Sequence, residues 1–148
     1  MEQNTMELPP TNKPGCNDNA AIVAALTDRY EKLSEMMAQA TPPADIARFL
    51  YWPEIVVAGE GLGRVYRGLD DLMPMFVAVV STELSSNCSW TVTDPFVTSE
   101  SVAAAFTQVT SHFGGTKPDT NYCALYVWEK RGTDWKVIRE QVCNGLMR

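Results

Sequence analysis

The amino-acid sequence predicts one α+β domain, in which helices occupy the first half of the chain and an antiparallel sheet follows. Two observations support this prediction. Apolar residues recur at helical spacing up to about residue 84, and the segments after residue 87 have the composition of long strands separated by short turns. A curved, mainly antiparallel sheet wrapped around three helices leaves a cone with one open end. The order of elements therefore also predicts a ligand cavity.

Residues 1–17 lack a pattern that could form a core. They contain prolines and a glycine among polar residues, at Pro9, Pro10, Pro14 and Gly15. We interpret this segment as a flexible N-terminal tail and assign residues 18–148 to a single domain. The whole chain is 45% apolar and 20% charged, which is ordinary for a globular protein.

Three segments of the first half have helical periodicity. The first begins near residue 18 and ends before Thr41–Pro43. Its apolar face consists of residues three or four apart, namely Ile22, Leu26, Tyr30, Leu33 and Met37. A second, short helix runs from Ala44 to about Trp52, and a third, with acidic residues in its first turn, runs from about Leu69 to Leu84.

The rest of the chain predicts strands. A strand at residues 54–60 and a short partner at residues 64–67 flank the turn Gly61–Gly63. Four longer segments follow, joined by glycine-containing turns that favour antiparallel hairpins. They span residues 88–98, 102–113, 121–129 and 135–143.

The last strand carries the clearest indication of a pocket. Because side chains alternate between the two faces of a strand, five residues are expected to share one face: Trp135, Val137, Arg139, Gln141 and Cys143. Ile138 and Val142 are expected on the other face. A face that mixes aromatic, aliphatic, guanidinium and amide groups suits a cavity wall, so we expect Arg139 and Gln141 to point into the cavity.

The charge of the chain excludes some classes of partner. Lys and Arg total 12 against 18 acidic residues, which gives a net charge of −6. This argues against nucleic acids and anionic membranes, because both attract clustered cations. No apolar run approaches the roughly 20 residues that span a bilayer, and the N-terminus has no secretory signal pattern. We therefore expect a cytoplasmic protein that binds no nucleic acid and no membrane.

The cysteines and the single histidine predict neither a metal site nor a redox motif. Cys16, Cys88, Cys123 and Cys143 are separated by long, irregular intervals, and His112 is the only imidazole. In a cytosol these thiols would be reduced. We expect Cys123 and Cys143 to be small fillers on adjacent strands, and we expect no metal and no cofactor.

The order of elements and three short motifs resemble the nuclear transport factor 2-like superfamily, particularly its SnoaL-like and ketosteroid-isomerase-like branches. The motifs are Arg29-Tyr30 in the first helix, Val65–Gly68 before the third helix, and Trp135–Val142 at the end. The resemblance covers about residues 18–145. It implies a cone-shaped barrel and a homodimer packed through the outer face of the sheet. Apolar residues expected on that face agree with a covered surface, namely Leu125, Val127, Ile138 and Val142.

Catalytic residues of the superfamily match this chain only in part. Ketosteroid isomerases use a Tyr on the first helix as an oxyanion donor, and Tyr30 resembles that residue. Their Asp base on the first strand is matched by Ala58, with Glu60 one strand step further, and their second donor is matched by Ala124. Dehydratase members use histidines, of which only His112 is available. The Asp-Arg-Asp set of epoxide hydrolase members has no match.

These comparisons and the residue chemistry define two groups of candidates. The candidate catalytic residues are Tyr30, Glu60, His112 and Arg139. Tyr30 and Arg139 would orient and polarise an oxygen, and Glu60 or His112 would move a proton. The structural alternatives are a core position for Tyr30 and solvated positions for the other three. The candidate ligand-binding residues are Trp52, Trp90, Tyr126, Trp128 and Gln141.

Three functions are compatible with this pattern. The first is an enzyme of lyase, isomerase or hydrolase type that acts on a small hydrophobic molecule. The second is a non-catalytic binding or carrier protein that uses the same pocket, and the third is a dimerisation module whose cavity is filled by its own side chains. A perturbed carboxyl or imidazole beside a hydroxyl donor in the cavity would favour the enzyme. The fold alone does not discriminate among the three.

Overall fold

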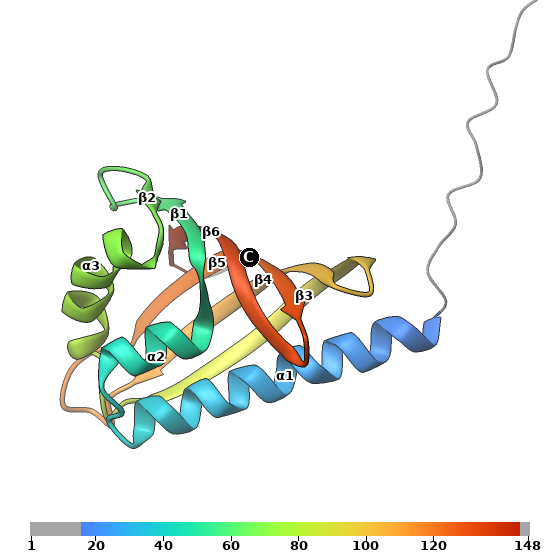
Figure 1. The fold of residues 1–148 in the computed structure, drawn as a ribbon. Coiled ribbons are helices and arrows are strands. Elements are labelled where there is room, and N and C mark those ends of the chain that lie inside the picture. The colour runs from blue at the N-terminus through green and yellow to red at the C-terminus, as the bar shows by residue number, and fades with distance from the viewer. Residues whose placement is uncertain (1–15, 146–148) are drawn as a thin grey trace, which may run out of the picture.

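The computed structural model describes residues 16–145, which form an open six-stranded sheet packed against three helices (Figure 1). The helices are α1 (Cys16–Ala38), α2 (Pro43–Leu50) and α3 (Leu69–Ser81). The strands are β1 (Tyr51–Gly59), β2 (Tyr66–Arg67), β3 (Asn87–Ser99), β4 (Val102–His112), β5 (Thr120–Arg131) and β6 (Asp134–Asn144). Of the predicted tail, residues 1–15 lie outside the described residues, and α1 already includes Cys16.

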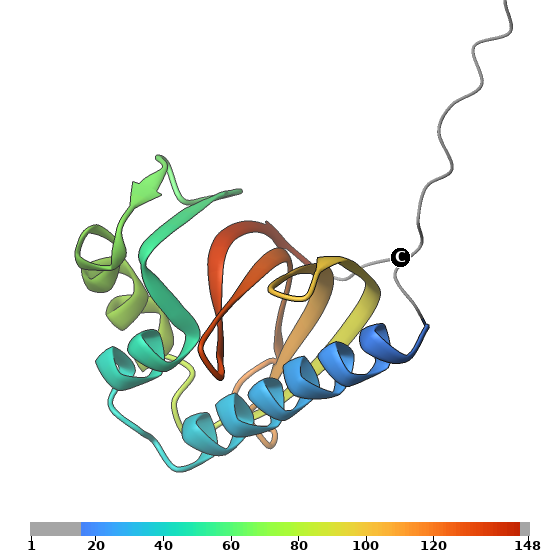
Figure 2. The same ribbon diagram turned by 45° about the vertical axis from the view of Figure 1, so that its right-hand side comes forward.

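The sheet has the strand order β2-β1-β6-β5-β4-β3. β1 pairs with β6 in parallel, and the other neighbours are antiparallel. The predicted α+β class and the mainly antiparallel sheet are therefore confirmed. The sheet does not close, because β2 and β3 remain as its edges. α1 packs against β3, while α2 and α3 pack against each other beside β1 (Figure 2).

The predicted element boundaries differ from the observed ones mainly around Pro53. The second helix ends at Leu50 rather than near Trp52, and β1 begins at Tyr51 and runs through Pro53. A proline disfavours helix continuation, but it is compatible with an extended backbone where no N–H is needed for pairing. The third helix ends at Ser81, three residues before the predicted end at Leu84.

The Val65–Gly68 motif fixes the start of α3. The guanidinium of Arg64 donates two hydrogen bonds to the Asp71 carboxylate, at 2.9 and 3.0 Å, and the same carboxylate accepts the backbone N–H of Arg67 at 2.9 Å. Gly68 has a φ of +89°, a conformation that side chains disfavour, and its N–H donates to the Ile55 carbonyl at 2.7 Å. The motif therefore attaches α3 to β1, which is a structural role.

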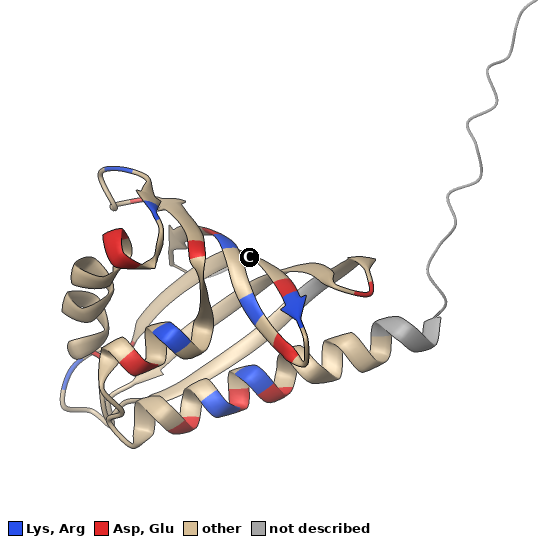
Figure 3. Ribbon diagram, in the orientation of Figure 1, with Lys and Arg blue, Asp and Glu red and all other residues tan. Residues whose placement is uncertain are grey.

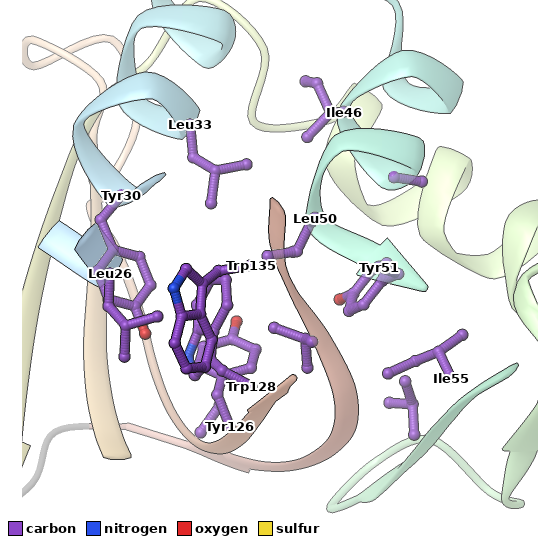
Figure 4. Packing of buried hydrophobic residues seen from close by; sticks show 14 of the residues in the cluster. Leu26, Tyr30, Leu33, Ile46, Leu50, Tyr51, Ile55, Tyr126, Trp128 and Trp135 are labelled. Carbon is purple, nitrogen blue, oxygen red and sulfur yellow. The ribbon is translucent and has the colours of Figure 1, made fainter. Parts of the chain in front are cut away.

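The core lies between α1, α2 and the concave face of the sheet. Figure 4 shows Trp128 and Trp135 between Leu26 and Tyr30 of α1 and Leu50 at the end of α2. Each of these side chains is at most 5% exposed. Charged residues of both signs follow one another along α1 (Figure 3), and four of them are exposed: Asp28, Glu31, Lys32 and Glu35. This amphipathic pattern is what the apolar spacing of the first helix predicts.

A β-bulge interrupts β6 at Ile138. Trp128 pairs with Val137, but the preceding residue of β5, Val127, pairs with Arg139, so Ile138 has no partner on β5. One extra residue reverses the phase of side-chain alternation beyond it. Before the bulge, Trp135 and Val137 are buried.

Beyond the bulge the two faces of β6 are exchanged relative to the prediction. Glu140 is buried and Val142 is half-buried, whereas Arg139, Gln141 and Cys143 are exposed. The expectation that Arg139 and Gln141 point into the cavity is therefore wrong, and so is the outward position expected for Val142. The physical reason is that a strict two-residue period holds only in a strand without a bulge.

The exposed arginine stabilises the irregular backbone. The Arg139 guanidinium donates to the carbonyl of Ile138, the bulged residue, at 2.6 Å and makes a longer contact of 3.4 Å with the Glu54 carbonyl. This bond is made where the bulge interrupts the pairing of β6 with β5. Arg139 is therefore a residue of the outer sheet face, where Val56 and Val127 are its neighbours across the strands.

Cys123 and Cys143 provide a test of this register. They are cross-strand partners with the bulge present, whereas without it Cys143 would lie on the opposite face of the sheet from Cys123. Partner residues of antiparallel strands have Cα atoms about 4.5–5.5 Å apart, within the range of a disulfide. We expect diamide to close a disulfide between these two thiols within one chain that also carries Cys16→Ser and Cys88→Ser.

Peptide mass spectrometry of the digested protein detects the cross-link. The matched control moves the second thiol by one position, to residue 142, by combining Val142→Cys with Cys143→Ala. Residue 142 lines the cavity, so this control should remain reduced. Cross-linking of the control in place of the parent would show that β6 has no bulge.

Candidate functional site

A cavity of about 330 Å³ lies between α3 and the strands β1, β5 and β6. α3 provides an apolar wall, to which Leu72, Met75 and Phe76 contribute. The turn after β1 forms part of the lining, with the exposed Glu60 among its residues. The polar lining side chains include Tyr51, Glu83, Tyr122 and Glu140. Its volume is at the small end of the range of about 300–1,000 Å³ for small-molecule sites.

A narrower hollow of about 50 Å³ adjoins this cavity toward α1. The two share five lining residues: Tyr51, Phe76, Val80, Glu83 and Tyr122. Trp90 lines the narrower hollow and also a surface groove between α1 and β3. That groove has a volume of about 420 Å³, and Tyr30 also lines it. Of these three spaces, the cavity on the α3 side is the one lined by a buried carboxyl side chain, Glu140.

Glu140 is the most perturbed titratable group of the cavity. Its side chain is nine-tenths buried, with a relative exposure of 8%, and its Oε2 accepts a hydrogen bond from the Tyr51 hydroxyl at 2.6 Å. Burial raises the pKa of Glu140 from 4.5 to about 7, although hydrogen bonding by Tyr51 and Tyr126 acts in the opposite direction. No ion pair neutralises Glu140 within the described part of the chain.

Three phenols surround this carboxyl and stay protonated at neutral pH. Burial raises the pKa of Tyr51, Tyr122 and Tyr126 well above the ordinary value, and the negative charge of Glu140 raises each pKa further. Neutral phenols are hydrogen-bond donors. Tyr122 lines the cavity together with Tyr51, so this wall presents a proton-transfer group next to donors that could stabilise a developing oxyanion.

A second carboxylate, Glu83, faces the same space from the end of α3. Its Oε2 accepts the Ser111 hydroxyl at 2.9 Å and its Oε1 accepts the Thr120 hydroxyl at 3.1 Å. Both donors are neutral, so they orient the carboxylate without cancelling its charge. Glu60, a predicted catalytic residue, contributes a third carboxylate, whose Oε2 accepts the Asn144 backbone N–H at 3.0 Å.

Tyr30 is a core residue rather than a cavity residue. It is 3% exposed, its hydroxyl lies 2.7 Å from Thr107 Oγ1, and burial raises its pKa to about 12. Its ring stacks on Trp90 with centroids 5.3 Å apart and meets Trp128 edge-on at 5.4 Å. Tyr126 belongs to the same cluster at 6.4 Å. These aromatics fill the α1 side of the barrel, where an open pocket was expected.

The other predicted residues lie away from the cavity. Trp52 donates from Nε1 to the Glu129 carbonyl at 2.8 Å and lies beneath the cations of Arg131 and Lys136. His112 is exposed, and its Nδ1 is 2.7 Å from Asp119 Oδ2. It shares a face of β4 with Phe106, and that face is the outer one.

Gln141 and Arg139 are likewise on the outer face and line a shallow hollow there with Leu125 and Val127. Of the predicted site residues, only Glu60 lines the main cavity. The other polar residues discussed there were not identified from the sequence: Tyr51, Glu83, Tyr122 and Glu140. One signal could have identified Glu140. Arg139 and Glu140 are adjacent in a closing strand, so one of the two must face inward.

Within residues 16–145, no three His, Cys, Asp or Glu side chains are grouped so that they could hold a metal ion. No helix in this part of the chain combines the length and apolar character that crossing a membrane requires.

Neither a family model nor a curated protein matches this sequence. Solved structures match its fold. A scytalone dehydratase-like protein from Novosphingobium aromaticivorans has a TM-score of 0.70 at 14% identity, over 89% of each chain. A nuclear transport factor 2-like protein of unknown function from Pseudomonas putida has a TM-score of 0.65 at 14% identity, over 86% of this chain and 89% of that one.

A third similar structure is the hexachlorocyclohexane dehydrochlorinase LinA-type3 from Novosphingobium barchaimii. Its TM-score is 0.61 at 17% identity, and the match covers 89% of this chain and 92% of that one. The chain therefore has the nuclear transport factor 2-like fold, as its order of elements predicted. At these identities the similarity establishes the fold, and the site has to be argued from its own residues.

The raised pKa of Glu140 makes stability depend on pH. Between its ordinary pKa of 4.5 and about 7, the folded protein binds the proton more tightly than the unfolded chain. This contribution is fully present below pH 4.5 and is lost as the pH rises to about 7. Relative to its value at low pH, the free energy of unfolding should therefore fall by about 3 kcal/mol at pH 8.

Glu140→Gln keeps the size of the side chain but removes the ionisable group. The free energy of unfolding of this variant should therefore not fall between low pH and pH 8. Urea unfolding between pH 4 and 8 measures the effect, with Glu100→Gln in an exposed turn as the matched control. If the free energy of unfolding depends on pH in the same way in the wild type and in Glu140→Gln, Glu140 is not a buried ionisable group.

Proposed function

We propose that the protein is an enzyme of lyase, isomerase or hydrolase type that acts on a small hydrophobic molecule in the 330 Å³ cavity. The observation that carries this proposal is the Glu140 carboxyl, which is buried, has a pKa of about 7 and accepts a hydrogen bond from a phenol. A carboxyl whose pKa lies near the operating pH can both accept and donate a proton.

In the proposed reaction each residue has a distinct role. Glu140 in its ionised form removes a proton from the ligand, and in its protonated form it returns one. Tyr51 holds the carboxyl in place through its 2.6 Å hydrogen bond. Tyr122, a half-buried residue of the lining whose phenol stays protonated, donates a hydrogen bond to the ligand oxygen that becomes negative. The apolar side chains of α3 hold the body of the ligand and exclude water.

The similar structures support a small-molecule function without naming a substrate. Two of them are named as enzymes that process small molecules, a scytalone dehydratase-like protein and a dehydrochlorinase. The alternative is a binding or carrier protein that uses the same cavity without catalysis. The perturbed Glu140 favours the enzyme, because carboxyls with strongly shifted pKa values inside cavities are most common at catalytic sites.

A thermal-shift screen with steroid-, terpene- and polyketide-like molecules tests whether the cavity binds ligands. A compound that fits should raise the melting temperature of the wild type. Met75→Trp fills the cavity from α3 and should abolish the shift, whereas Arg139→Ala, on the outer face, should leave it unchanged. If no compound stabilises the wild type, the cavity is not a binding site for these classes.

Deuterium exchange of 2-tetralone in D₂O, followed by NMR, tests proton transfer. The wild type should accelerate exchange at the carbon next to the carbonyl, above the rate in buffer. Glu140→Gln should lower the accelerated rate by about 100-fold or more, the usual effect of removing a general base. Ligand binding without any difference in exchange between wild type and variant would favour the carrier.

We also propose that two copies pack through the outer face of the sheet. Phe106 is 46% exposed there and pairs with Leu125 on β5, and Phe96 on β3 is 66% exposed. Ala104 and Val127 form the adjacent cross-strand pair. An apolar surface that spans three neighbouring strands is typical of an interface, and a symmetric pair of sheets would cover it on both copies.

Light scattering after size-exclusion chromatography tests this proposal. The wild type should have twice the 16.4 kDa mass of one chain. Phe106→Lys places a charge at the centre of the surface and should shift the protein to the monomer. Val65→Lys changes an exposed apolar residue outside the sheet face and should leave the dimer intact. A wild type that stays monomeric at every concentration would refute the dimer.

A further inference from the structure

We propose that the ligand of the cavity is an organic cation, a protonated amine attached to an apolar body about the size of two fused rings. This inference rests on the proposed function, since it names the class of molecule that the same cavity takes. It follows from the charge, the burial and the arrangement of the lining residues.

The lining carries one sign of charge. Three carboxylates contribute to it, those of Glu60, Glu83 and Glu140, and among the described residues no Lys, Arg or His lines the cavity. A recess with charges of one sign and apolar walls concentrates counter-ions and repels ions of its own sign. The net charge of the whole chain, −6, also attracts cations and repels anions. The cavity therefore disfavours ligands that carry a carboxylate or phosphate and favours cations.

The carboxylates lack a cationic partner inside the protein. Glu140 is nine-tenths buried, and neither it nor Glu83 forms an ion pair among residues 16–145. Their hydrogen-bond donors are hydroxyl groups, from Tyr51 to Glu140 and from Ser111 and Thr120 to Glu83. A buried ionised carboxylate without a counter-charge is unfavourable, and a cationic ligand would supply that charge.

The aromatic residues fit the same kind of ligand. Tyr51, Phe76 and Tyr122 line both the cavity and the hollow next to it, and Tyr51 meets Phe76 edge-on at 5.5 Å. The face of an aromatic ring attracts an ammonium group, and this attraction is stronger at a desolvated site. Rings and carboxylates together are the usual surroundings of a bound amine.

The arrangement of the carboxylates does not suit a divalent metal ion. A divalent metal needs several oxygen ligands that converge on one point, and no such group of His, Cys, Asp or Glu occurs in the described part of the chain. The carboxylates are instead distributed around a space whose remaining wall is apolar, formed by Leu72, Met75 and Val80 of α3. A ligand with one charged end and an apolar body satisfies both surfaces.

Three molecules with the same ring system and different charges test the inference: 2-naphthylmethylamine, 2-naphthylmethanol and 2-naphthoate. Isothermal titration calorimetry at pH 8 measures the dissociation constant of each for the full chain. We expect the amine to bind at least tenfold more tightly than the alcohol, and we expect no binding of the naphthoate. An alcohol that binds as tightly as the amine, or a naphthoate that binds more tightly, would overturn the inference.

Three substitutions locate the effect. Glu83→Gln and Glu140→Gln should each reduce the affinity for the amine about tenfold and leave the affinity for the alcohol unchanged. Glu60→Gln changes an exposed carboxylate at the cavity lining, so it keeps the test valid if the buried variants do not fold, and it should weaken amine binding by a smaller factor. Glu100→Gln lies outside the cavity and should have no effect. Equal amine affinity in all four variants would overturn the inference.

The results also separate this inference from the proposed function. If the alcohol binds and the amine has no advantage, the cavity is a small-molecule site without selectivity for cations. If none of the three naphthyl compounds binds but a neutral or anionic compound of the thermal-shift screen does, the charge inference is again overturned while the binding proposal stands. If nothing binds in either experiment, both fail.

Discussion

The β-bulge at Ile138 is the constraint on which the site depends. It lies between the part of β6 that faces the aromatic core and the part that faces the cavity, so the strand buries Val137 before it and Glu140 after it. Arg139, directed to the outer face, hydrogen-bonds the carbonyl of the bulged residue. In a regular strand a guanidinium would stand where the carboxyl now stands. The sign of charge inside the barrel therefore follows from backbone geometry rather than from composition.

Glu140 is held by opposing effects. Burial disfavours its charged form, and the hydroxyls of Tyr51 and Tyr126 favour it, which leaves the pKa at about 7. A fully ionised carboxylate at this depth would cost several kcal/mol, and a permanently neutral one could not accept a proton. The site thus sacrifices some stability near neutral pH for a group that can change its protonation state, a compromise common at functional sites.

The fold was predictable from the sequence because periodicity is a local signal. The apolar spacing of α1 and the alternation within β4 and β5 each follow from a few neighbouring residues. The site was mostly not predictable. An inserted residue such as Ile138 leaves no mark in an alternating pattern, so Arg139 and Gln141 were assigned to the wrong face. Tyr30 was placed on the correct face of its helix, but whether that face lines a space or fills one depends on residues from distant strands, among them Trp90 and Trp128.

Trp90 lies between two of the spaces in and on the barrel. Its side chain separates the hollow beside the cavity from the groove on the surface between α1 and β3, since it lines both. The indole Nε1 is buried without a hydrogen-bond partner among the described residues, so replacing it forfeits no polar contact. A small residue at this position would join the two spaces into a passage with an entrance at each end. The cavity beside α3 would then be continuous with the groove between α1 and β3, and the joined space would accommodate longer, chain-like compounds.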